Sequence, residues 1–529
     1  MRKRKSRLGD IVNSDPLYIG KPDYGYNRLA GSVWGSAGES YLTYRQSTAY
    51  QARKALVVVG ANDGMLHGFD ASLADGGNEL FAYVPRTLMG ELYRLTDPSY
   101  SHRYYVDGSP TGGDAWINNS WKSLIVGTAG AGGNTVFALD ASDPSNMAPS
   151  NVLWEFSSPD MRYPIQKPAL VALENGKFGV IVTSGFSDSS VSQGKIWILD
   201  AGTGSVLKTF TVSTTGGLGE PLAIDTNNDR IVDRLYAGDT AGNIWRFDLK
   251  GVNPANWDAP AALKSGANIL PLFTARTANG TSNPAQPITA PLEAALNSDG
   301  NPLILFGTGS YYQIGDNEVP ANPRLETFYG LIDRGQQISR SNLVEQAIIA
   351  QQTIGNRRAR AVTSAKIGSD NSGWFMDLVW KSSNGGSGAL TSERVIARPT
   401  LRNGVLVFTT MTPNSDPCGG GGTSWIMTLD VLNGGTLNFS FFDYNGDGTF
   451  DQGDYYSLAN GTKVPFSGIS YDQSGIIKTP SFVRGNGDTT DGSTATGKLC
   501  HSDSNGNTIC QDINDPNSSS KRMTWREIR

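Results

Sequence analysis

Hydrophobic and polar residues alternate along most of the chain in short runs that end in turn-forming residues. The most regular unit is an aliphatic run ending in Gly, then a loop, then an alternating run ending in Asp, as in LVVVGANDGMLHGFDA and LYAGDTAGNIWRFDL. Alternation with a period of two is typical of a half-buried β-strand, and two such runs joined by a Gly-containing turn predict a hairpin. The pattern therefore predicts a succession of antiparallel β-hairpins.

A Pro followed by apolar residues precedes most of these hairpins. Pro lacks a backbone N–H, so it is tolerated at the first position of a strand, where that group need not join the ladder. The motif occurs seven times, at Pro16, Pro110, Pro168, Pro221, Pro291, Pro399 and Pro480. Each copy would open one small antiparallel sheet, and such sheets bury both faces by stacking radially. We therefore predict an all-β fold, a seven-bladed β-propeller.

Successive copies are further apart than the ~40–50 residues of a minimal blade, so the surplus must form loop insertions. Two insertions, Thr87–Leu95 and Ser341–Gln351, have amphipathic patterns that predict short helices. We see no second domain, so residues 10–529 are predicted to form a single propeller domain. Residues 1–9 contain the basic run RKRKSR and are predicted to be a flexible arm or a linker remnant.

Composition supports β structure and narrows the classes of partner. The chain has 63 Gly, and its formal net charge is -5. Gly-rich turns favour an all-β architecture, and the basic surface that nucleic-acid binding requires is missing, so we expect no nucleic-acid partner. No stretch approaches the ~20 apolar residues of a membrane span.

Cysteine usage suggests an oxidising compartment. Cys500 and Cys510 flank a predicted hairpin with an Asn-Gly turn, a spacing that suits a disulfide. Cys418 lies in a Gly-rich loop, and the sequence does not indicate its state. No apolar signal segment follows Met1. We therefore expect the chain to be part of a longer exported protein.

The acidic stretch DTNNDRIVD precedes a predicted strand and has the spacing of a calcium loop. With Asp225 as position 1, side-chain oxygens occupy positions 1, 3, 5 and 9, and position 7 would offer its backbone carbonyl, as in the first nine positions of an EF-hand loop. Calcium fits this oxygen set, whereas zinc would need His or Cys. The predicted ligands are Asp225, Asn227, Asp229, Ile231 and Asp233.

Two positions depart from the EF-hand pattern. Position 6 is Arg230 instead of Gly, and left-handed backbone there would cost about 1–2 kcal/mol. Position 12, Tyr236, is not a carboxylate, so the missing ligand would be water, another backbone carbonyl or a residue from elsewhere. The alternative is a polar turn whose acids face water.

A second stretch, DYNGDGTFDQGD, matches the full twelve-residue spacing and has Gly448 at position 6. Its position 12 is Asp instead of Glu, and the shorter side chain would hinder bidentate ligation. The alternative is a tight, solvated turn. The predicted ligands are Asp443, Asn445, Asp447, Thr449 through its carbonyl, Asp451 and Asp454.

The hairpin form VVVGANDGMLHGFDA resembles the quinoprotein-type repeat of pyrroloquinoline quinone dehydrogenases, which makes such an enzyme the alternative function. Those enzymes carry an adjacent Cys–Cys disulfide over the cofactor, and this chain has no such pair. It also has neither a G-x-S-x-G nor an H-E-x-x-H motif. We predict that it is not an enzyme and assign no catalytic residues.

Several long stretches resemble, in order, the C-terminal domain of the type IV pilus biogenesis and tip-adhesin family PilY/PilC. They are LGDIVNSDP, VVVGANDGMLHGFDA with ELFAYVP, YYVDGSPTGGDAW, LIVGTAGAGGNTVFALD, DTNNDRIVDRLYAGDTAGNIWRFDL and the terminal WREI. The resemblance implies a modified, quinoprotein-like propeller at the C-terminal end of a large exported protein. It also implies that calcium binds the loop that begins at Asp225. Loop 443–454 is inferred from spacing alone.

The resemblance further implies a role in pilus assembly, adhesion and calcium-dependent control of pilus retraction, hence of twitching motility. The partners it implies are pilins and minor pilins, the pilus assembly machinery and a host-cell surface receptor. The location it implies is the pilus tip or outer-membrane surface, reached through the periplasm. A purely structural scaffold stabilised by calcium is the remaining alternative.

Overall fold

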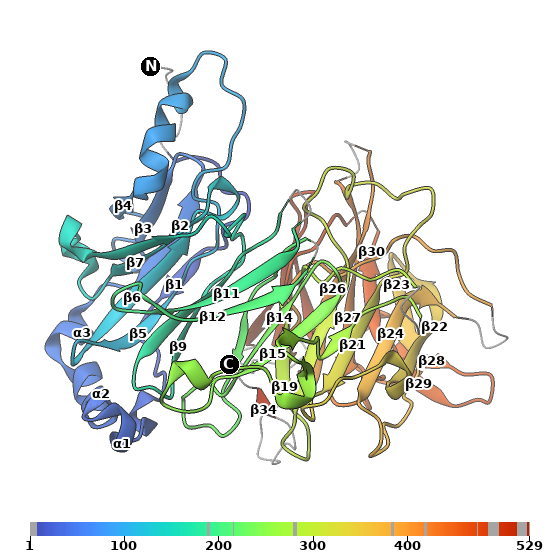
Figure 1. The fold of residues 1–529 in the computed structure, drawn as a ribbon. Coiled ribbons are helices and arrows are strands. Elements are labelled where there is room, and N and C mark those ends of the chain that lie inside the picture. Colours follow the sequence, from blue (N-terminus) through green and yellow to red (C-terminus); the bar gives the residue numbers. More distant parts are fainter. Residues whose placement is uncertain are drawn as a thin grey trace. The chain divides into compact units, whose positions relative to one another are not determined.

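The regular secondary structure of the computed structural model is mostly β-strand, with few and short helices (Figure 1). It describes residues 8–187, 191–214, 216–278, 283–381, 386–416, 420–472, 474–484, 497–515 and 526–527. The all-β propeller class predicted from the alternating pattern is confirmed. Cys418 and most of the basic arm lie outside the described residues.

Four sheets have four strands each. The first contains β1 (Leu17–Ile19), β2 (Leu56–Ala61), β3 (Met65–Asp70) and β4 (Glu79–Tyr83). The second contains β5 (Thr111–Ile117), β6 (Ser120–Thr128), β7 (Thr135–Asp140) and β8 (Val152–Ser157). The third contains β9 (Ala169–Ala172), β10 (Phe178–Thr183), β11 (Gln193–Asp200) and β12 (Val206–Ser213). The fourth contains β13 (Leu222–Ile224), β14 (Arg234–Gly238), β15 (Asn243–Asp248) and β18 (Phe273–Thr274).

A fifth sheet has eleven strands, in the order β25-β26-β27-β30-β23-β22-β24-β21-β20-β19-β34. Its first strands along the chain are β19 (Glu293–Leu296), β20 (Pro302–Gly307), β21 (Thr327–Ile332), β22 (Val344–Ile354), β23 (Arg357–Val362) and β24 (Gly373–Trp380). The others are β25 (Thr400–Arg402), β26 (Val405–Pro413), β27 (Gly422–Asp430), β30 (Gly468–Tyr471) and β34 (Arg526–Glu527).

Smaller sheets and helices complete the described chain. A three-stranded sheet contains β31 (Ser481–Arg484), β32 (Gly497–Ser502) and β33 (Thr508–Ile513), and two hairpins are β16 (Lys264–Ser265) with β17 (Asn268–Ile269) and β28 (Tyr455–Ser457) with β29 (Lys463–Pro465). The α-helices are α1 (Gly31–Trp34), α2 (Ala37–Gln46) and α3 (Thr48–Ala52). The 3₁₀ turns are η1 (Tyr26–Arg28), η2 (Arg86–Thr96), η3 (Gly130–Gly132), η4 (Pro144–Asn146), η5 (Pro149–Asn151), η6 (Pro254–Asn256), η7 (Ala261–Leu263), η8 (Arg340–Asn342) and η9 (Gln452–Asp454).

The prediction of seven blades is wrong, because the structure has a five-blade arrangement: four four-stranded sheets and the eleven-stranded one. Each of the seven Pro motifs does precede a strand, namely β1, β5, β9, β13, β19, β25 and β31. The strands led by Pro291 and Pro399 share one sheet, because inserted strands β22, β23 and β30 pair in series between β24 and β27. The strand led by Pro480 opens only the three-stranded sheet.

The two predicted helices have different outcomes. Residues 87–95 are helical, within the 3₁₀ segment η2. Residues 341–351 are not, since most of them belong to the eleven-residue strand β22. Its inward residues Gln346, Ile348 and Ala350 alternate with more exposed ones, so the strand period prevails over the helical pattern once β23 and β24 supply hydrogen-bond partners.

The Asp that ends each repeat organises the turn after its strand. Oδ1 of Asp70 accepts the amide of Ser72 at 2.8 Å, and Asp140, Asp200 and Asp430 accept amides two residues ahead in the same way. Such bonds stabilise a turn locally. In the first three sheets a Lys of the hairpin pairs with this carboxylate, in the pairs Lys54–Asp70, Lys122–Asp140 and Lys177–Asp200.

By Cα proximity the chain forms two compact units: unit 1 is residues 1–237 and 245–270, and unit 2 is residues 238–244 and 271–529. Each has its own apolar core. One core of unit 1 joins the second and third sheets to helices α1 and α2 through Trp34, Tyr41, Trp121 and Phe178. A core of unit 2 gathers Phe441, Phe442, Tyr444 and Phe466 with Ile469.

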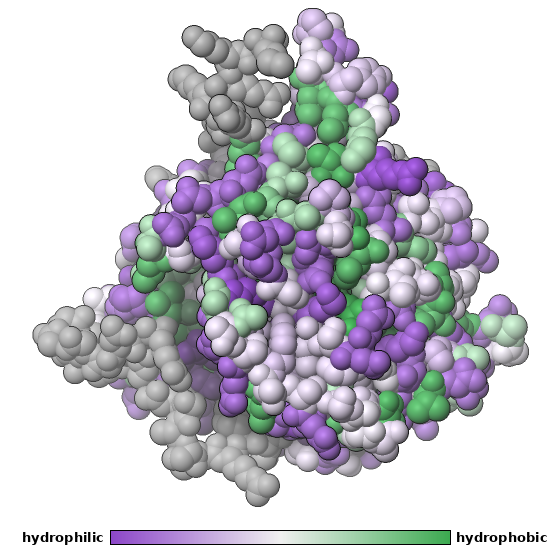
Figure 2. All heavy atoms as spheres, turned by 90° about the vertical axis from the view of Figure 1, so that its left-hand side faces the viewer, coloured by the Kyte–Doolittle hydropathy of each residue, from purple (hydrophilic) through white to green (hydrophobic). Residues whose placement is uncertain are grey.

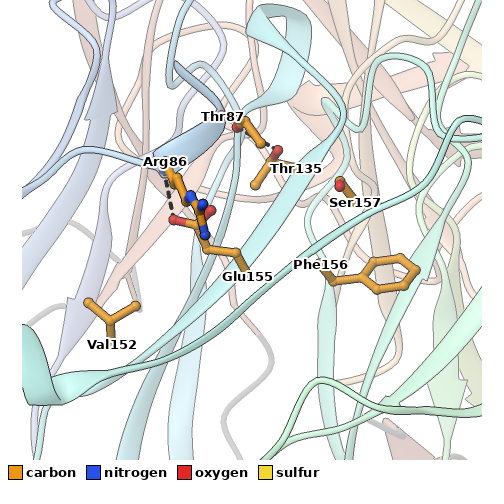
Figure 3. A pocket seen from close by; sticks show the side chains of 7 residues that line it. All are labelled: Arg86, Thr87, Thr135, Val152, Glu155, Phe156 and Ser157. Carbon is orange, nitrogen blue, oxygen red and sulfur yellow. Dashed lines mark hydrogen bonds between the residues drawn. The ribbon is translucent and has the colours of Figure 1, made fainter. Parts of the chain in front are cut away.

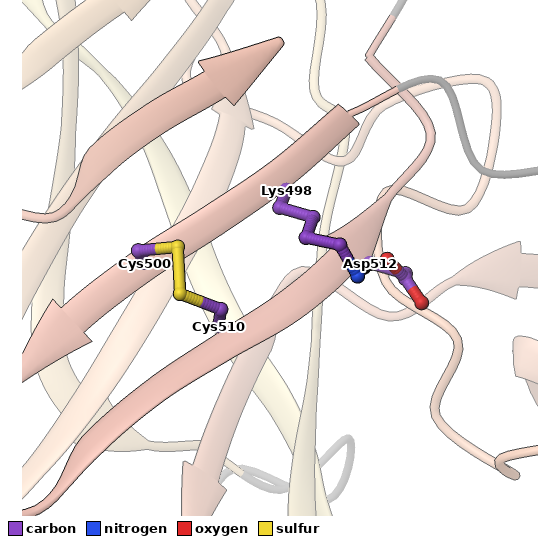
Figure 4. The surroundings of a disulfide bond; sticks show 4 residues. All are labelled: Lys498, Cys500, Cys510 and Asp512. Atoms are coloured by element: carbon purple, nitrogen blue, oxygen red, sulfur yellow. Dashed lines mark hydrogen bonds and ion pairs between the residues drawn. A yellow bond between two sulfur atoms is a disulfide. The ribbon is translucent and has the colours of Figure 1, made fainter. Parts of the chain in front are cut away.

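The predicted disulfide is confirmed. Cys500 on β32 and Cys510 on β33 are directly opposite in the sheet and joined by a disulfide, next to an ion pair between Lys498 and Asp512 of 2.7 Å (Figure 4). None of the helices in the described part of the chain is long and apolar enough to cross a membrane. The face drawn in Figure 2 intersperses hydrophilic and hydrophobic residues, as a water-exposed surface does.

Two candidate calcium loops

Loop 1, residues 225–233, connects β13 to β14 and wraps its backbone around the carboxylate of Asp225. Oδ1 of Asp225 accepts the amides of Asn227 at 3.1 Å and Asn228 at 2.6 Å, and Oδ2 accepts the amide of Arg230 at 2.9 Å. Asp225 is buried, with 7% of its surface exposed. Position 1 therefore sets the path of the first six residues of the loop.

Positions 3 and 5 of loop 1 form two further turns of the same kind. Oδ1 of Asn227 accepts the amide of Asp229 at 3.0 Å, and Oδ1 of Asp229 accepts the amide of Ile231 at 2.8 Å. The amide group of Asn227 also donates to Oδ2 of Asp229 at 3.0 Å. The side-chain oxygens of positions 1, 3 and 5 thus each accept an amide further along the loop.

Asp233 closes loop 1 by turning back to its start. Its Oδ2 accepts the amide of Thr226 at 2.8 Å and the Thr226 hydroxyl at 2.5 Å. In this way a carboxylate at position 9 reaches position 2, so the loop ends after nine residues and needs no ligand at Tyr236. The sequence suggested Asp233 as a ligand but not this closing role, which depends on the backbone path.

The left-handed backbone expected at Arg230 is present. Arg230 has φ of 74° and Asn228 has φ of 68°. Asn adopts this conformation readily, but for Arg it is unfavourable by about 1–2 kcal/mol. The Arg230 side chain lies against Gly25, with Nε 2.8 Å from the place a Cβ would take.

Loop 1 is anchored to neighbouring elements of unit 1. Ile231 is buried in the core that includes Trp34, and the amide of Val232 donates to the carbonyl of Ala172 on β9 at 3.0 Å. Nη1 of Arg28 on η1 donates to the carbonyl of Asn228 at 3.4 Å. The loop therefore contacts both a blade strand and the N-terminal helical segment, contacts that the sequence did not reveal.

Loop 2, residues 443–454, lies between β27 and β30 and repeats most of the bonds of loop 1. Asp443 accepts the amides of Gly446 at 2.6 Å and Gly448 at 2.9 Å, which are positions 4 and 6. Oδ1 of Asn445 accepts the amide of Asp447 at 3.0 Å. Asp447 in turn accepts the amide of Thr449 at 2.8 Å. These correspond to the bonds made by Asp225, Asn227 and Asp229.

Loop 2 closes at position 12. Oδ1 of Asp454 accepts the amides of Tyr444 at 2.6 Å and Asn445 at 3.2 Å. Asp454 is fully buried, and its other oxygen, Oδ2, is buried without a hydrogen-bond partner. Burial, and then the charge of nearby Asp443, raise the pKa of Asp454 to about 6 against the opposing effect of the two amides. Asp451, at position 9, is exposed and accepts the amide of Gly453 at 2.6 Å.

The chemistry of both loops fits calcium, although neither is a tight carboxylate cluster. Within the described ranges, no three or more His, Cys, Asp and Glu side chains are gathered as a metal-binding group. A carboxylate has about four lone-pair directions on two oxygens, so one that accepts an amide can still bind an ion. Binding would therefore require the acids of each loop to draw together on a backbone path that is already formed.

A cavity of about 450 Å³ lies elsewhere in unit 1, lined by residues of η2, β7 and β8 (Figure 3). Oε1 of Glu155 accepts the amide of Arg86 at 2.8 Å, and the hydroxyls of Thr87 and Thr135 are 2.7 Å apart. These bonds fix η2 against the sheet. None of the residues that the sequence predicts as calcium ligands lines this cavity.

Comparison with known proteins confirms the resemblance. Residues 8–364 match the family model described as the PilY1 beta-propeller domain, a range that contains loop 1 but not loop 2. The chain is 36% identical over 458 residues to a type IV pilus biogenesis factor PilY1 homolog of Xylella fastidiosa, covering 82% of this chain and 30% of that protein. It is 32% identical over 571 aligned positions to PilY1 of Pseudomonas aeruginosa strain PAO1, covering 100% of this chain and 46% of that protein.

A solved structure agrees. The crystal structure of the P. aeruginosa PilY1 C-terminal domain superposes with a TM-score of 0.71 at 27% identity, covering 94% of this chain and 100% of that one. The chain thus spans less than half the length of the curated relatives it matches. Since the family model spans more than half of its residues, the chain belongs to the PilY1 β-propeller family, whose named relatives are type IV pilus biogenesis factors.

Proposed function

We propose that this chain is the calcium-responsive propeller of a type IV pilus biogenesis factor, and that occupancy of loop 1 by Ca²⁺ regulates pilus extension and retraction, and with them twitching motility and surface adhesion. The observation that carries the proposal is that Asp225, Asp229 and Asp233 belong to one nine-residue loop, closed by their bonds to its own amides, whose two end residues are buried. Three carboxylates in so short a loop repel one another unless a cation lies between them.

Calcium would act by changing how firmly the loop is ordered. Without the ion, repulsion favours opening the turn; with it, the carboxylates converge and fix positions 1 to 9. A partner that prefers one of these states is coupled to calcium through its difference in affinity for the two. The coupling is reciprocal, so such a partner would also change the calcium affinity of the loop.

The contacts of loop 1 supply a route for this coupling. Arg28 donates to the carbonyl of Asn228, and the Arg230 side chain packs on Gly25. Both contacts connect the loop to the segment that runs from Gly25 through α3. Ordering the loop would therefore restrict the motion of this helical segment. We propose that the segment forms the calcium-dependent contact with the partner.

We propose pilins, minor pilins and the assembly machinery as the partners, with a host-cell receptor for adhesion, at the pilus tip or outer-membrane surface after export through the periplasm. Relatives named as pilus biogenesis factors support an association with pili. No catalytic step is part of this proposal.

Asp229→Ala in the full-length protein is the sharpest test. Asp229 is partly exposed and accepts one backbone amide, so its loss should spare the fold, whereas Asp225 also shapes the loop and is a poor probe. The variant should lose calcium uptake at loop 1 in calorimetry and change pilus number and twitching in cells. Asp97→Ala is the matched control, because Asp97 is an exposed Asp that caps the Ser99 amide at 2.8 Å.

The rival roles give different results in the same test. If calcium only stabilises a scaffold, Asp229→Ala lowers the calcium-dependent melting temperature but leaves motility normal. If the chain is a quinone-dependent dehydrogenase, the protein oxidises alcohols after addition of the cofactor. Unchanged calcium uptake by Asp229→Ala, with loop 2 also disabled, would remove the basis of the proposal.

A further inference from the structure

Loop 2 lies outside the residues that match the PilY1 family model, in an insertion between β27 and β30. The family model therefore does not cover it. Its motif was singled out by spacing, but spacing and turns alone also describe a solvated bend. The structure adds an independent observation at position 12, the last position of the loop.

That observation is the buried carboxylate of Asp454. One oxygen accepts the amides of positions 2 and 3, so the group points into the start of the loop. The other oxygen, Oδ2, has no hydrogen-bond partner and no exposure to solvent. A buried anionic oxygen without a partner is strongly unfavourable. A positive ion held by the loop would remove this cost.

We infer that loop 2 is a second calcium site, closed by Asp454 and independent of loop 1. The side-chain oxygens come from positions 1, 3, 5, 9 and 12, and position 7 contributes its carbonyl, which meets the six to eight oxygen ligands that calcium takes. The ligands are Asp443, Asn445, Asp447, Thr449, Asp451 and Asp454.

The surroundings of loop 2 suit a calcium ion that orders the insertion. Tyr444 at position 2 is buried and packs on Phe466, with ring centroids 5.1 Å apart, and Nη1 of Arg357 on β23 donates to the carbonyl of Asp443. Gly446 and Gly448 take the left-handed positions, with φ of 79° and 82°. The backbone is therefore preformed and tied to the core of unit 2, and only side chains need to move on binding.

The two loops can be tested separately with calcium alone as the probe. Isothermal titration of the purified 529-residue chain should give two ions for wild type and one each for Asp229→Ala and Asp447→Ala. Asp447 is exposed, so its replacement should not unfold the chain. Asp454→Asn, which keeps an oxygen for the two amides but removes the charge, should weaken the second site at least tenfold. Asp299→Ala, at an exposed turn of unit 2, is the matched control.

The result for Asp447→Ala decides this inference, and the result for Asp229→Ala decides the proposed function. Loss of one ion in Asp447→Ala, with the other affinity unchanged, supports the second site even if loop 1 fails its own test. A wild-type stoichiometry and affinity in both Asp447→Ala and Asp454→Asn would overturn it. So would a wild-type chain that takes up one ion, lost completely in Asp229→Ala.

Discussion

Loop 1 and loop 2 share the bonds that position 1 accepts from the amides of positions 4 and 6, position 3 from position 5, and position 5 from position 7. They do so although they lie in different compact units and 218 residues separate their first positions, Asp225 and Asp443. They differ in how they end. Loop 1 closes at position 9 with Asp233 on the Thr226 amide, and loop 2 closes at position 12 with Asp454 on the Tyr444 amide. In both, the last carboxylate reaches position 2. The comparison teaches that each loop ends where a carboxylate accepts the amide of position 2, whether the loop has nine residues or twelve.

The loops also differ at positions 4 and 6. Loop 1 places Asn228 and Arg230 where loop 2 has Gly446 and Gly448, yet all four backbones are left-handed. Arg230 is therefore retained at a conformational cost, and its side chain packs on Gly25 of the segment that we propose as the responsive one. Loop 2 makes no equivalent use of position 6, since nothing lies within 4 Å of a Cβ built on Gly448. We infer that loop 1 transmits calcium binding to the segment around Gly25, whereas loop 2 stabilises its own insertion in unit 2.

Removal of calcium should have the largest effect on this comparison. An ion at a thousand times its Kd stabilises the state that binds it by about 4 kcal/mol. Chelation should therefore raise hydrogen exchange in both loops, measured by mass spectrometry. Asp447→Ala with calcium present should show the increase in loop 2 alone. Equal exchange with and without calcium in both loops would contradict the comparison.

A pH change should alter the stability of unit 2 through Glu326, which is far from loop 2 in the sequence. Burial raises the pKa of Glu326 to about 7, and Thr308 donates to its Oε2 at 2.6 Å. Because the folded pKa lies above the unfolded value of 4.5, the folded state binds more protons between these values. Stability should therefore fall as pH rises from about 4.5 to about 7, by up to roughly 3 kcal/mol.

Glu326→Gln should reduce the slope of this part of the pH profile, measured from urea unfolding midpoints at pH 5 and pH 8. The loops are then best compared at pH 8, where this group no longer titrates. A wild-type profile that is already flat between pH 5 and pH 8 would show that Glu326 does not titrate in this range.

Loss of the disulfide should weaken loop 2 and spare loop 1. Phe442, next to Asp443, forms a β-bridge with Ile513 on β33, and β33 is tied to β32 by Cys500–Cys510 with a sequence separation of 10. Opening so short a closed loop costs roughly 2–3 kcal/mol. Cys500→Ser with Cys510→Ser should raise hydrogen exchange around loop 2, while exchange in loop 1 stays as in wild type. An equal rise in both loops would argue against their independence.

Substitutions at position 6 should change stability least, and they should act in opposite directions in the two loops. Arg230→Gly relieves the left-handed Arg and should stabilise unit 1 by about 1 kcal/mol, whereas Gly448→Ala should destabilise unit 2 by about 1 kcal/mol. Urea denaturation measures both changes. Arg230→Gly should also loosen the contact with Gly25, so twitching should become less sensitive to calcium. Destabilisation by Arg230→Gly would show that the side-chain contact outweighs the backbone strain.

The sequence predicted individual strands better than their grouping. All seven Pro-led strands and the Asp-capped turns after Asp70, Asp140, Asp200 and Asp430 depend on local chemistry, and they are present. The number of blades depends on which edges pair, and β22 helps to join two predicted blades although residues 341–351 have an amphipathic helical pattern. Edge pairing is a tertiary effect that one sequence does not reveal.

The loops show the same division. The oxygen spacing and the left-handed backbone at Arg230 followed from the sequence, because EF-hand geometry is local. The closure of loop 1 at Asp233 did not, because it depends on Ile231 entering a core with Trp34 and on Val232 bonding to Ala172. Helices α1 to α3 were also missed, since the residues that α2 buries are mostly small, Ala37 and Gly38 with Tyr41, and give a weak helical pattern.

The most direct measurement of the central claim is anomalous diffraction from crystals of this chain grown with calcium. If both loops bind calcium, the anomalous map should show one calcium peak among Asp225, Asp229 and Asp233. It should show another among Asp443, Asp447 and Asp454. Refined maps without either peak, in which these carboxylates bind only backbone amides, would contradict it.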